Sequence, residues 1–124
     1  MSQDIVSDTL NQIINAKKAH KSVLEVNHSC KLLISVLALA KLKGYIKDYK
    51  FDKKVLRIQI GKLNECRAIK PRYAVMASEI EKYETRYLPA RNFGMLILST
   101  SKGLMTNQTA KDKNIGGSLI AYMY

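Results

Sequence analysis

The sequence of 124 residues has few of the residue types that catalyse reactions, bind metals or form disulfides. Its two cysteines, Cys30 and Cys66, stand alone, with no Cys-x-x-Cys motif and no neighbouring histidine pair. We therefore expect free buried thiols in a reducing compartment and no metal site. Its two histidines, His20 and His28, are not spaced as in a Ser- or Cys-based catalytic triad. These absences predict a protein that is not an enzyme and that uses no cofactor or small-molecule substrate.

Long apolar runs are also missing. The longest apolar stretch, Val36 to Ala40, is far shorter than the roughly 20 residues that cross a bilayer as a helix. The first residues, Met1 to Thr9, include Asp4 and Asp8 and lack the basic segment and apolar run of a targeting peptide. We expect a cytoplasmic protein with no membrane partner.

Acidic residues are scarce relative to basic ones. There are 21 Lys and Arg against 10 Asp and Glu, which makes the formal net charge +11. The excess is shared, because residues 1–66 carry 12 basic and 6 acidic side chains and residues 67–124 carry 9 and 4. A chain that is 47% hydrophobic and 25% charged has the composition of a folded domain, and such a basic surface favours a polyanionic partner. A nucleic acid is the favoured partner, and a soluble protein from a lysine-rich or high-salt proteome is the alternative.

Apolar periodicity predicts two small mixed units. In the first half we expect helices over residues 4–19 and from the N-cap Ser29 to Gly44, with strands over 22–26, 45–51 and 54–60. In the second half we expect an edge strand or extended segment over 68–76, a helix over 78–86 with a Ser78/Glu81 capping box, and a strand over 94–98. A polar loop, a short helix capped by Thr106, a turn at Gly116-Gly117 and a strand over 118–124 follow. The predicted fold class is α+β, with domains 1–66 and 67–124 built from short helices on small, mostly antiparallel sheets.

Ser99-Thr100-Ser101-Lys102-Gly103 is the most suggestive local sequence. Hydroxyl groups, a lysine and a glycine directly after an apolar strand can donate to phosphate and ribose oxygens. An ordinary polar connection from strand to helix explains the same residues without a ligand, and both interpretations stay open. A second basic group, made of Lys17, Lys18, Lys21 and Lys31, fits a binding surface or a solvated face equally well.

Two other groups have mainly structural interpretations. Glu79, Glu81 and Glu84 fall on one predicted helix, where a solvated surface is favoured over a catalytic carboxylate pair. The seven tyrosines are spread along the chain rather than paired as in a stacking platform. We expect Tyr45, Tyr49, Tyr83 and Tyr122 to lie in the core or at its rim.

Collinear stretches along nearly the whole chain resemble small-subunit ribosomal protein eight. The most specific is the run from Phe93 to Thr106, followed by Ala110-Lys111 and Ile115-Gly116-Gly117. The segments that resemble the archaeal and eukaryotic branch are Gly61 to Cys66, Ile69 to Tyr73 and Tyr87 to Arg91. The ending, Leu119 to Tyr124, looks archaeal, and the first half matches at Asn15-Ala16, Ser29-Cys30-Lys31 and Gly44-Tyr45-Ile46.

The resemblance implies a two-domain protein of the ribosome that binds the central domain of small-subunit rRNA, supports assembly of the platform and contacts neighbouring ribosomal proteins. By this resemblance, the main contact with RNA is the loop made of Ser99, Thr100, Ser101, Lys102 and Gly103. It adds Asn15 and Lys31 as RNA contacts of the first half, and Gly116 and Gly117 as residues that shape the surface beside the loop. A free basic RNA-binding regulator that uses the same surface is the alternative.

Overall fold

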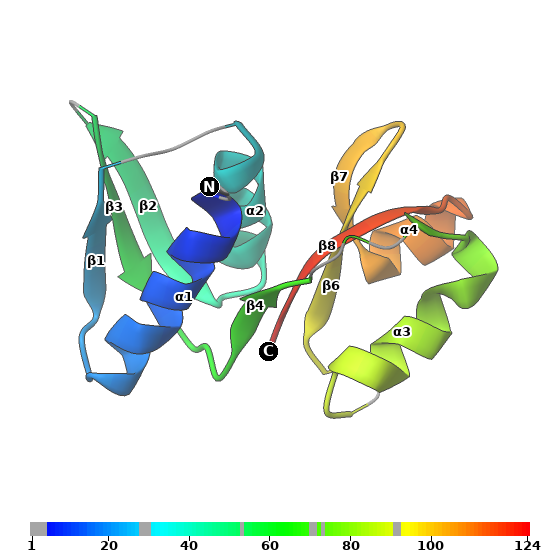
Figure 1. Cartoon of the computed structure of the whole chain (residues 1–124), viewed down its shortest axis with the longest axis horizontal. Coiled ribbons are helices and arrows are strands. Elements are labelled where there is room, and N and C mark those ends of the chain that lie inside the picture. Colours follow the sequence, from blue (N-terminus) through cyan, green and yellow to red (C-terminus); the bar gives the residue numbers. More distant parts are fainter. Residues whose placement is uncertain (1–4, 28–30, 53, 70–71, 73, 91–92) are drawn as a thin grey trace. The chain divides into compact units, whose positions relative to one another are not determined.

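The computed structural model describes residues 5–27, 31–52, 54–69, 72, 74–90 and 93–124. The chain divides into two compact units, residues 1–66 and 67–124. In the described residues each unit combines helices with a small antiparallel sheet (Figure 1), which confirms the predicted α+β class. None of the described helices is both long enough and apolar enough to span a bilayer.

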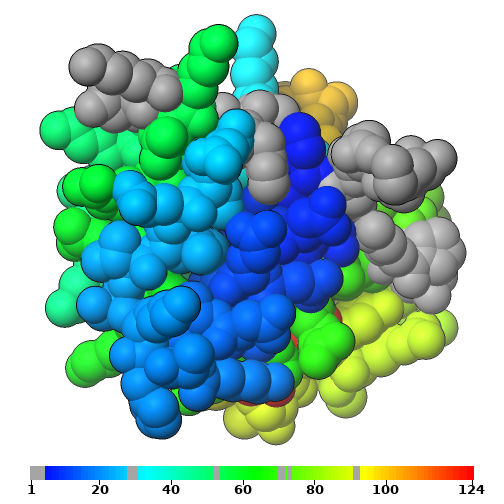
Figure 2. All heavy atoms as spheres, turned by 60° about the vertical axis from the view of Figure 1, so that its left-hand side comes forward, coloured from blue at the N-terminus to red at the C-terminus, as the bar shows by residue number. Residues whose placement is uncertain are grey.

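Unit 1 has a sheet of three strands with two helices on one face (Figure 1). Its elements are α1 (Ile5–Lys18), β1 (Val23–Val26), α2 (Lys31–Leu42), β2 (Ile46–Asp52) and β3 (Val55–Ile60). The strand order is β1-β3-β2, with antiparallel pairing on both sides of β3. Both helices lie on one side of β3, and Figure 2 shows the outer surface of α1.

The core of unit 1 follows from the alternation along β3. Leu56 and Ile58 are fully buried, whereas Arg57 between them is exposed and forms a 2.8 Å ion pair with Glu25 of β1. Leu10 and Ile13 of α1 are fully buried, in keeping with their helical spacing. These two periodicities, two in the strand and 3.6 in the helix, place apolar side chains on facing surfaces.

The predicted elements of unit 1 are confirmed to within one or two residues over the part that the structure describes. The predicted N-cap Ser29 and also Cys30 lie outside the described residues. Cys66 is buried, as expected, and its Sγ donates to the carbonyl of Leu10 over 3.4 Å.

Unit 2 has a sheet of five strands with order β4-β8-β6-β7, to which β5 is added on β8. Its elements are β4 (Cys66–Ala68), β5 (Ala74–Val75), a 3-10 turn (Ala77–Glu79), α3 (Ile80–Tyr87), β6 (Met95–Thr100), β7 (Gly103–Thr106), α4 (Asn107–Lys113) and β8 (Gly117–Met123). The extended segment predicted over 68–76 starts at the last residue of β4 and contains β5, and residues 70, 71 and 73 lie outside the description.

The core of unit 2 lies between its sheet and its helices. Its buried members are Ile69, Val75, Ile80, Leu88, Leu96, Leu98, Met105, Ala110 and Leu119. Tyr83 and Tyr122 pack against this core, as predicted. Although the tyrosines are spread along the sequence, the fold brings three together: the rings of Tyr87 and Tyr122 stack with centroids 5.4 Å apart, and Tyr124 stacks on Tyr122 at 6.2 Å.

The predicted capping box of the helix in unit 2 is wrong by two residues. Ser78 lies inside the 3-10 turn, and the helix begins at Ile80. The carboxylate that bonds back to the chain is that of Glu79, whose Oε1 accepts from the amide of Met76 over 3.0 Å. The 3-10 turn precedes the helix, so the amide that lies three residues before an available carboxylate is that of Met76, and Glu79 rather than Glu81 accepts from it.

Candidate nucleic-acid interface

The loop predicted after the apolar strand is the tip of a β-hairpin. Ser99 and Thr100 are the last residues of β6, Ser101 and Lys102 form the turn, and Gly103 begins β7. The connection therefore joins two strands rather than a strand and a helix, so the predicted type of connection is wrong, while a polar turn without a ligand stays an alternative. The pairing of Thr100 with Gly103 closes the hairpin directly beside the turn.

Thr100 holds the turn in place through its hydroxyl group. Its Oγ1 donates to the carbonyl of Gly103 over 2.8 Å and accepts from the amide of Lys102 over 3.1 Å. Gly103 has φ +104, whereas neither turn residue has a positive φ. A side chain at position 103 would meet no atom but would be strained by this backbone conformation, so glycine is required by conformation rather than by space.

The other polar side chains of the tip are available to a ligand. Ser99, Ser101 and Lys102 are exposed, and none of the three makes a side-chain hydrogen bond or ion pair with the described residues. Two hydroxyl groups and one ammonium group therefore project from a turn whose backbone is fixed by Thr100. The hydroxyls can donate or accept, and the ammonium adds charge, which suits phosphate and ribose oxygens.

Gly116 and Gly117 allow close packing next to the hairpin. A Cβ atom at position 117 would lie 2.4 Å from the carbonyl oxygen of Ser99, and one at position 116 would lie 2.4 Å from that of Val75. These glycines let β8 approach β6 at the base of the tip and let the preceding turn approach β5. The structure thus places Gly117 directly against Ser99 of the predicted loop, while Gly116 lies against Val75 of β5.

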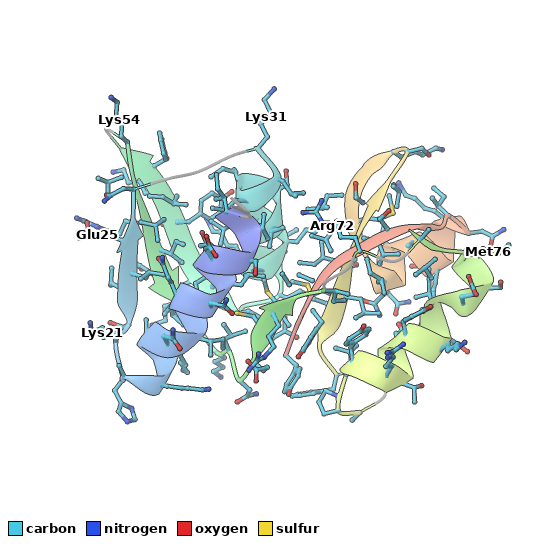
Figure 3. The ribbon with its side chains drawn as sticks, in the orientation of Figure 1. Lys21, Glu25, Lys31, Lys54, Arg72 and Met76 are labelled. Atoms are coloured by element: carbon cyan, nitrogen blue, oxygen red, sulfur yellow. The ribbon has the colours of Figure 1, made fainter. Side chains whose placement is uncertain are left out.

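Asn15 and Lys31, the predicted contacts of the first half, belong to unit 1. Both are exposed, with Asn15 near the end of α1 and Lys31 at the start of α2. The predicted basic group is divided, because Lys31 lies at one end of unit 1 and Lys21 at the other (Figure 3). The structure therefore groups Lys21 with Lys17 and Lys18 at the end of α1 and leaves Lys31 apart.

A buried polar network supports the hairpin and was missed by the sequence reasoning. Asn107, the first residue of α4, is only 7% exposed, and its Oδ1 accepts from the amide of Leu96 in β6 over 3.0 Å. Its Nδ2 donates to Oε2 of Glu84 in α3, and the ammonium group of Lys111 lies 3.0 Å from the same carboxylate. The expectation that Glu84 is solvated is therefore wrong, since its side chain is only 20% exposed.

The predicted N-cap Thr106 connects the hairpin to this network. It ends β7, and its side chain accepts from the amide of Thr109 in the first turn of α4, which confirms the predicted cap. A single residue thus terminates a strand and starts a helix. The strand β7 has few residues and alternates weakly, which explains why its apolar pair Leu104-Met105 was not recognised as a strand.

Comparison with known proteins adds two findings. The family model of ribosomal protein S8 matches residues 4–124. The small ribosomal subunit protein uS8 of Nanoarchaeum equitans (strain Kin4-M) is 46% identical over 129 aligned residues, which cover 100% of both chains. The similarity therefore extends through both units and includes the hairpin tip.

Proposed function

The chain belongs to the ribosomal protein S8 family, and we propose that it binds the central domain of small-subunit rRNA through the β6–β7 hairpin tip and supports assembly of the platform. As a member of this family it is a structural constituent of the small ribosomal subunit, with rRNA and ribosomal proteins as partners, and it is not an enzyme.

The exposed group at the hairpin tip carries this proposal. Ser99, Ser101 and Lys102 project from a turn that Thr100 and Gly103 fix, and the whole chain has a net charge of +11. Duplex RNA is recognised mainly through its shape, its phosphates and its 2′-hydroxyl groups. A fixed turn that presents hydroxyl groups and one positive charge fits such a target better than it fits a base-specific one.

Four further residues have roles in the same proposal. We assign Gly116 and Gly117 to the surface beside the tip, because their lack of side chains allows β8 and its preceding turn to pack closely. Asn15 and Lys31 supply contacts from unit 1, where both side chains are exposed. The two compact units then act as two domains that each contribute to RNA binding.

The test compares a fragment of the rRNA central domain with a scrambled duplex of equal length, at two salt concentrations. We expect tight binding to the fragment that persists at the higher concentration. Lys102→Ala should reduce the slope of log affinity against log salt by about one unit, because one phosphate contact is lost. The matched control is Lys82→Ala, an exposed lysine of α3, which should leave the slope unchanged.

Ser101→Ala tests the hydroxyl contact separately from the charge. Loss of one polar contact should cost about 1 kcal/mol, which corresponds to about a fivefold weaker affinity. Wild-type affinity in this variant would remove Ser101 from the contact. Equal and salt-sensitive binding of the wild type to both RNAs would contradict the ribosomal assignment of the tip and would favour a free RNA-binding regulator.

A further inference from the structure

One end of unit 1 gathers lysine residues from three separate segments. Figure 1 shows that α1, α2 and β3 all end there. The lysines at this end are Lys17 and Lys18 in the last turn of α1, Lys21 just after it, Lys43 just after α2, and Lys62 just after β3. We call these five residues the lysine end. All five are exposed, and Lys21 lies at the end of unit 1 opposite Lys31 (Figure 3).

Hydrogen bonds hold the three segments of the lysine end together. The Nζ of Lys17 lies 3.5 Å from the carbonyl oxygen of Gly61, and the amide of Lys62 donates to the carbonyl of Gly44 over 3.1 Å. A Cβ atom at position 61 would lie 2.5 Å from that same carbonyl oxygen of Gly44. Because position 61 is a glycine, the turn after β3 can pack closely against the end of α2. The bond between Lys62 and Gly44 then holds the backbone of Lys62 beside that helix end.

Both helix ends are closed by the backbone itself. The amide of Lys21 donates to the carbonyl of Ala16 over 2.9 Å, and the amide of Tyr45 donates to that of Ala40 over 3.0 Å. His20 and Gly44 take the left-handed conformation that such caps require, with φ 61 and φ 83. Because these caps already satisfy the terminal carbonyl groups, the lysine side chains are not needed as caps.

The lysine end keeps a strong positive charge after its neighbours are counted. Among the described residues, Asp48 is paired with Lys41 at 3.0 Å, and the carboxylate of Glu65, whose Oε1 is buried, offsets about one of the five lysines. Each helix C-terminus contributes about half a negative charge, so two of them offset about one more lysine and about three positive charges remain. Lys18, Lys21, Lys43 and Lys62 have no ion pair or side-chain hydrogen bond with the described part of the chain.

We propose that the lysine end binds the phosphates of a second RNA segment, so that the protein bridges this segment to the one held by the hairpin tip. The inference rests on the proposed function and extends it to a second surface. A rigid group of positive charges with no aromatic or amide side chain among its members binds backbone rather than bases. We therefore expect this contact to be independent of sequence and strongly dependent on salt.

The experiment uses the full chain and two labelled RNAs. The protein is first saturated with the central-domain fragment, and a short RNA duplex of unrelated sequence is then added, with co-diffusion of the two labels as the readout. The test variant is Lys21→Gln with Lys62→Gln, and the charge-matched control is Lys50→Gln with Lys82→Gln, two exposed lysines outside the lysine end. Thermal unfolding of both variants checks that they are as stable as the wild type.

We expect the wild type and the control to form the three-component complex and the test variant to lose it while still binding the fragment. Between about 50 and 200 mM salt, the affinity of the wild type for the second duplex should fall about tenfold more than that of the test variant, because two phosphate contacts are missing. An unchanged complex in the test variant, or no complex with the wild type, would overturn the proposal.

The two proposals fail in different ways. If the central-domain fragment does not bind, the proposed function fails. The unrelated duplex alone then tests the lysine end. Weaker binding by the test variant than by the control supports it, and equal binding by the two overturns it.

Discussion

Asn107→Ala is the substitution whose effect on stability can be worked out most fully. Leu96 is fully buried and lies one residue before the first pair between β6 and β7, so its amide has Asn107 as its acceptor rather than a strand. Removing the acceptor leaves a buried amide unsatisfied, at a cost of about 1–3 kcal/mol. Loss of the bond to Glu84 adds about 1 kcal/mol, because that carboxylate keeps Lys111 and some solvent.

The free energy of unfolding should therefore fall by about 2–4 kcal/mol. Urea unfolding followed by circular dichroism measures this change, and amide hydrogen exchange at Leu96 provides a local readout, which should become faster in the variant. The control is Gln108→Ala, the next residue of α4, which is exposed and whose bond to Asp112 is long at 3.4 Å. We expect it to change stability by less than about 0.5 kcal/mol.

A result for Asn107→Ala that matches the Gln108→Ala control would refute this reasoning. It would mean that water or a shifted backbone satisfies the amide of Leu96 once the side chain is gone. A loss of stability without faster exchange at Leu96 would contradict the assigned acceptor and would place the cost on the Glu84 side of the network.

Three more predictions follow from particular contacts. Gly117→Ala should lower both the stability of the fold and its affinity for the central-domain fragment, because the added methyl group would lie 2.4 Å from the carbonyl oxygen of Ser99 at the base of the tip. Unchanged stability and affinity in unfolding and binding assays would contradict this close approach. Glu79→Ala should destabilise the fold by about 1 kcal/mol, because the bond from its carboxylate to the amide of Met76 is lost. Glu81→Ala, at an exposed position, should have little effect, and a larger loss of stability for Glu81→Ala in urea unfolding would favour the Ser78/Glu81 capping box instead. The Lys41 ammonium group holds the pKa of Asp48 below its ordinary value of 3.8. The pair therefore stabilises the fold above that pH, and its contribution is lost as the pH falls through the lower pKa of the folded state. In an NMR titration of Lys41→Ala the pKa of Asp48 should rise toward 3.8, and no change would show that the pair does not form in solution.

The sequence alone predicts the elements whose signals are local. The stripe of α1, the alternation along β3 and the Thr106 cap each depend on residues a few positions apart, and all three are confirmed. Their reliability has a physical reason, because helical and strand periodicities determine which side chains share a face before any distant segment is considered. The excess positive charge of both halves is likewise a property of composition and needs no structure.

Tertiary structure decides the features that depend on residues far apart in the chain. Glu84 looks like a surface carboxylate in its own helix, and only its contacts with Asn107 and Lys111 of α4 show that it is a partly buried member of a network. Tertiary pairing also shows that the predicted polar loop is the tip of a hairpin, because β7 is identified by its pairing with β6 rather than by its own residues.

The same distinction holds for the two proposed RNA-binding surfaces. Lys102 and its neighbouring hydroxyl groups are contiguous, so the sequence by itself determined that they lie together after a buried strand. Lys21, Lys43 and Lys62 are about 20 residues apart along the chain, and only the shared end of α1, α2 and β3 places them on one surface. The sequence determines the charge and the local periodicity, whereas the grouping of distant charges depends on which helix and strand ends lie on the same side of the packed core.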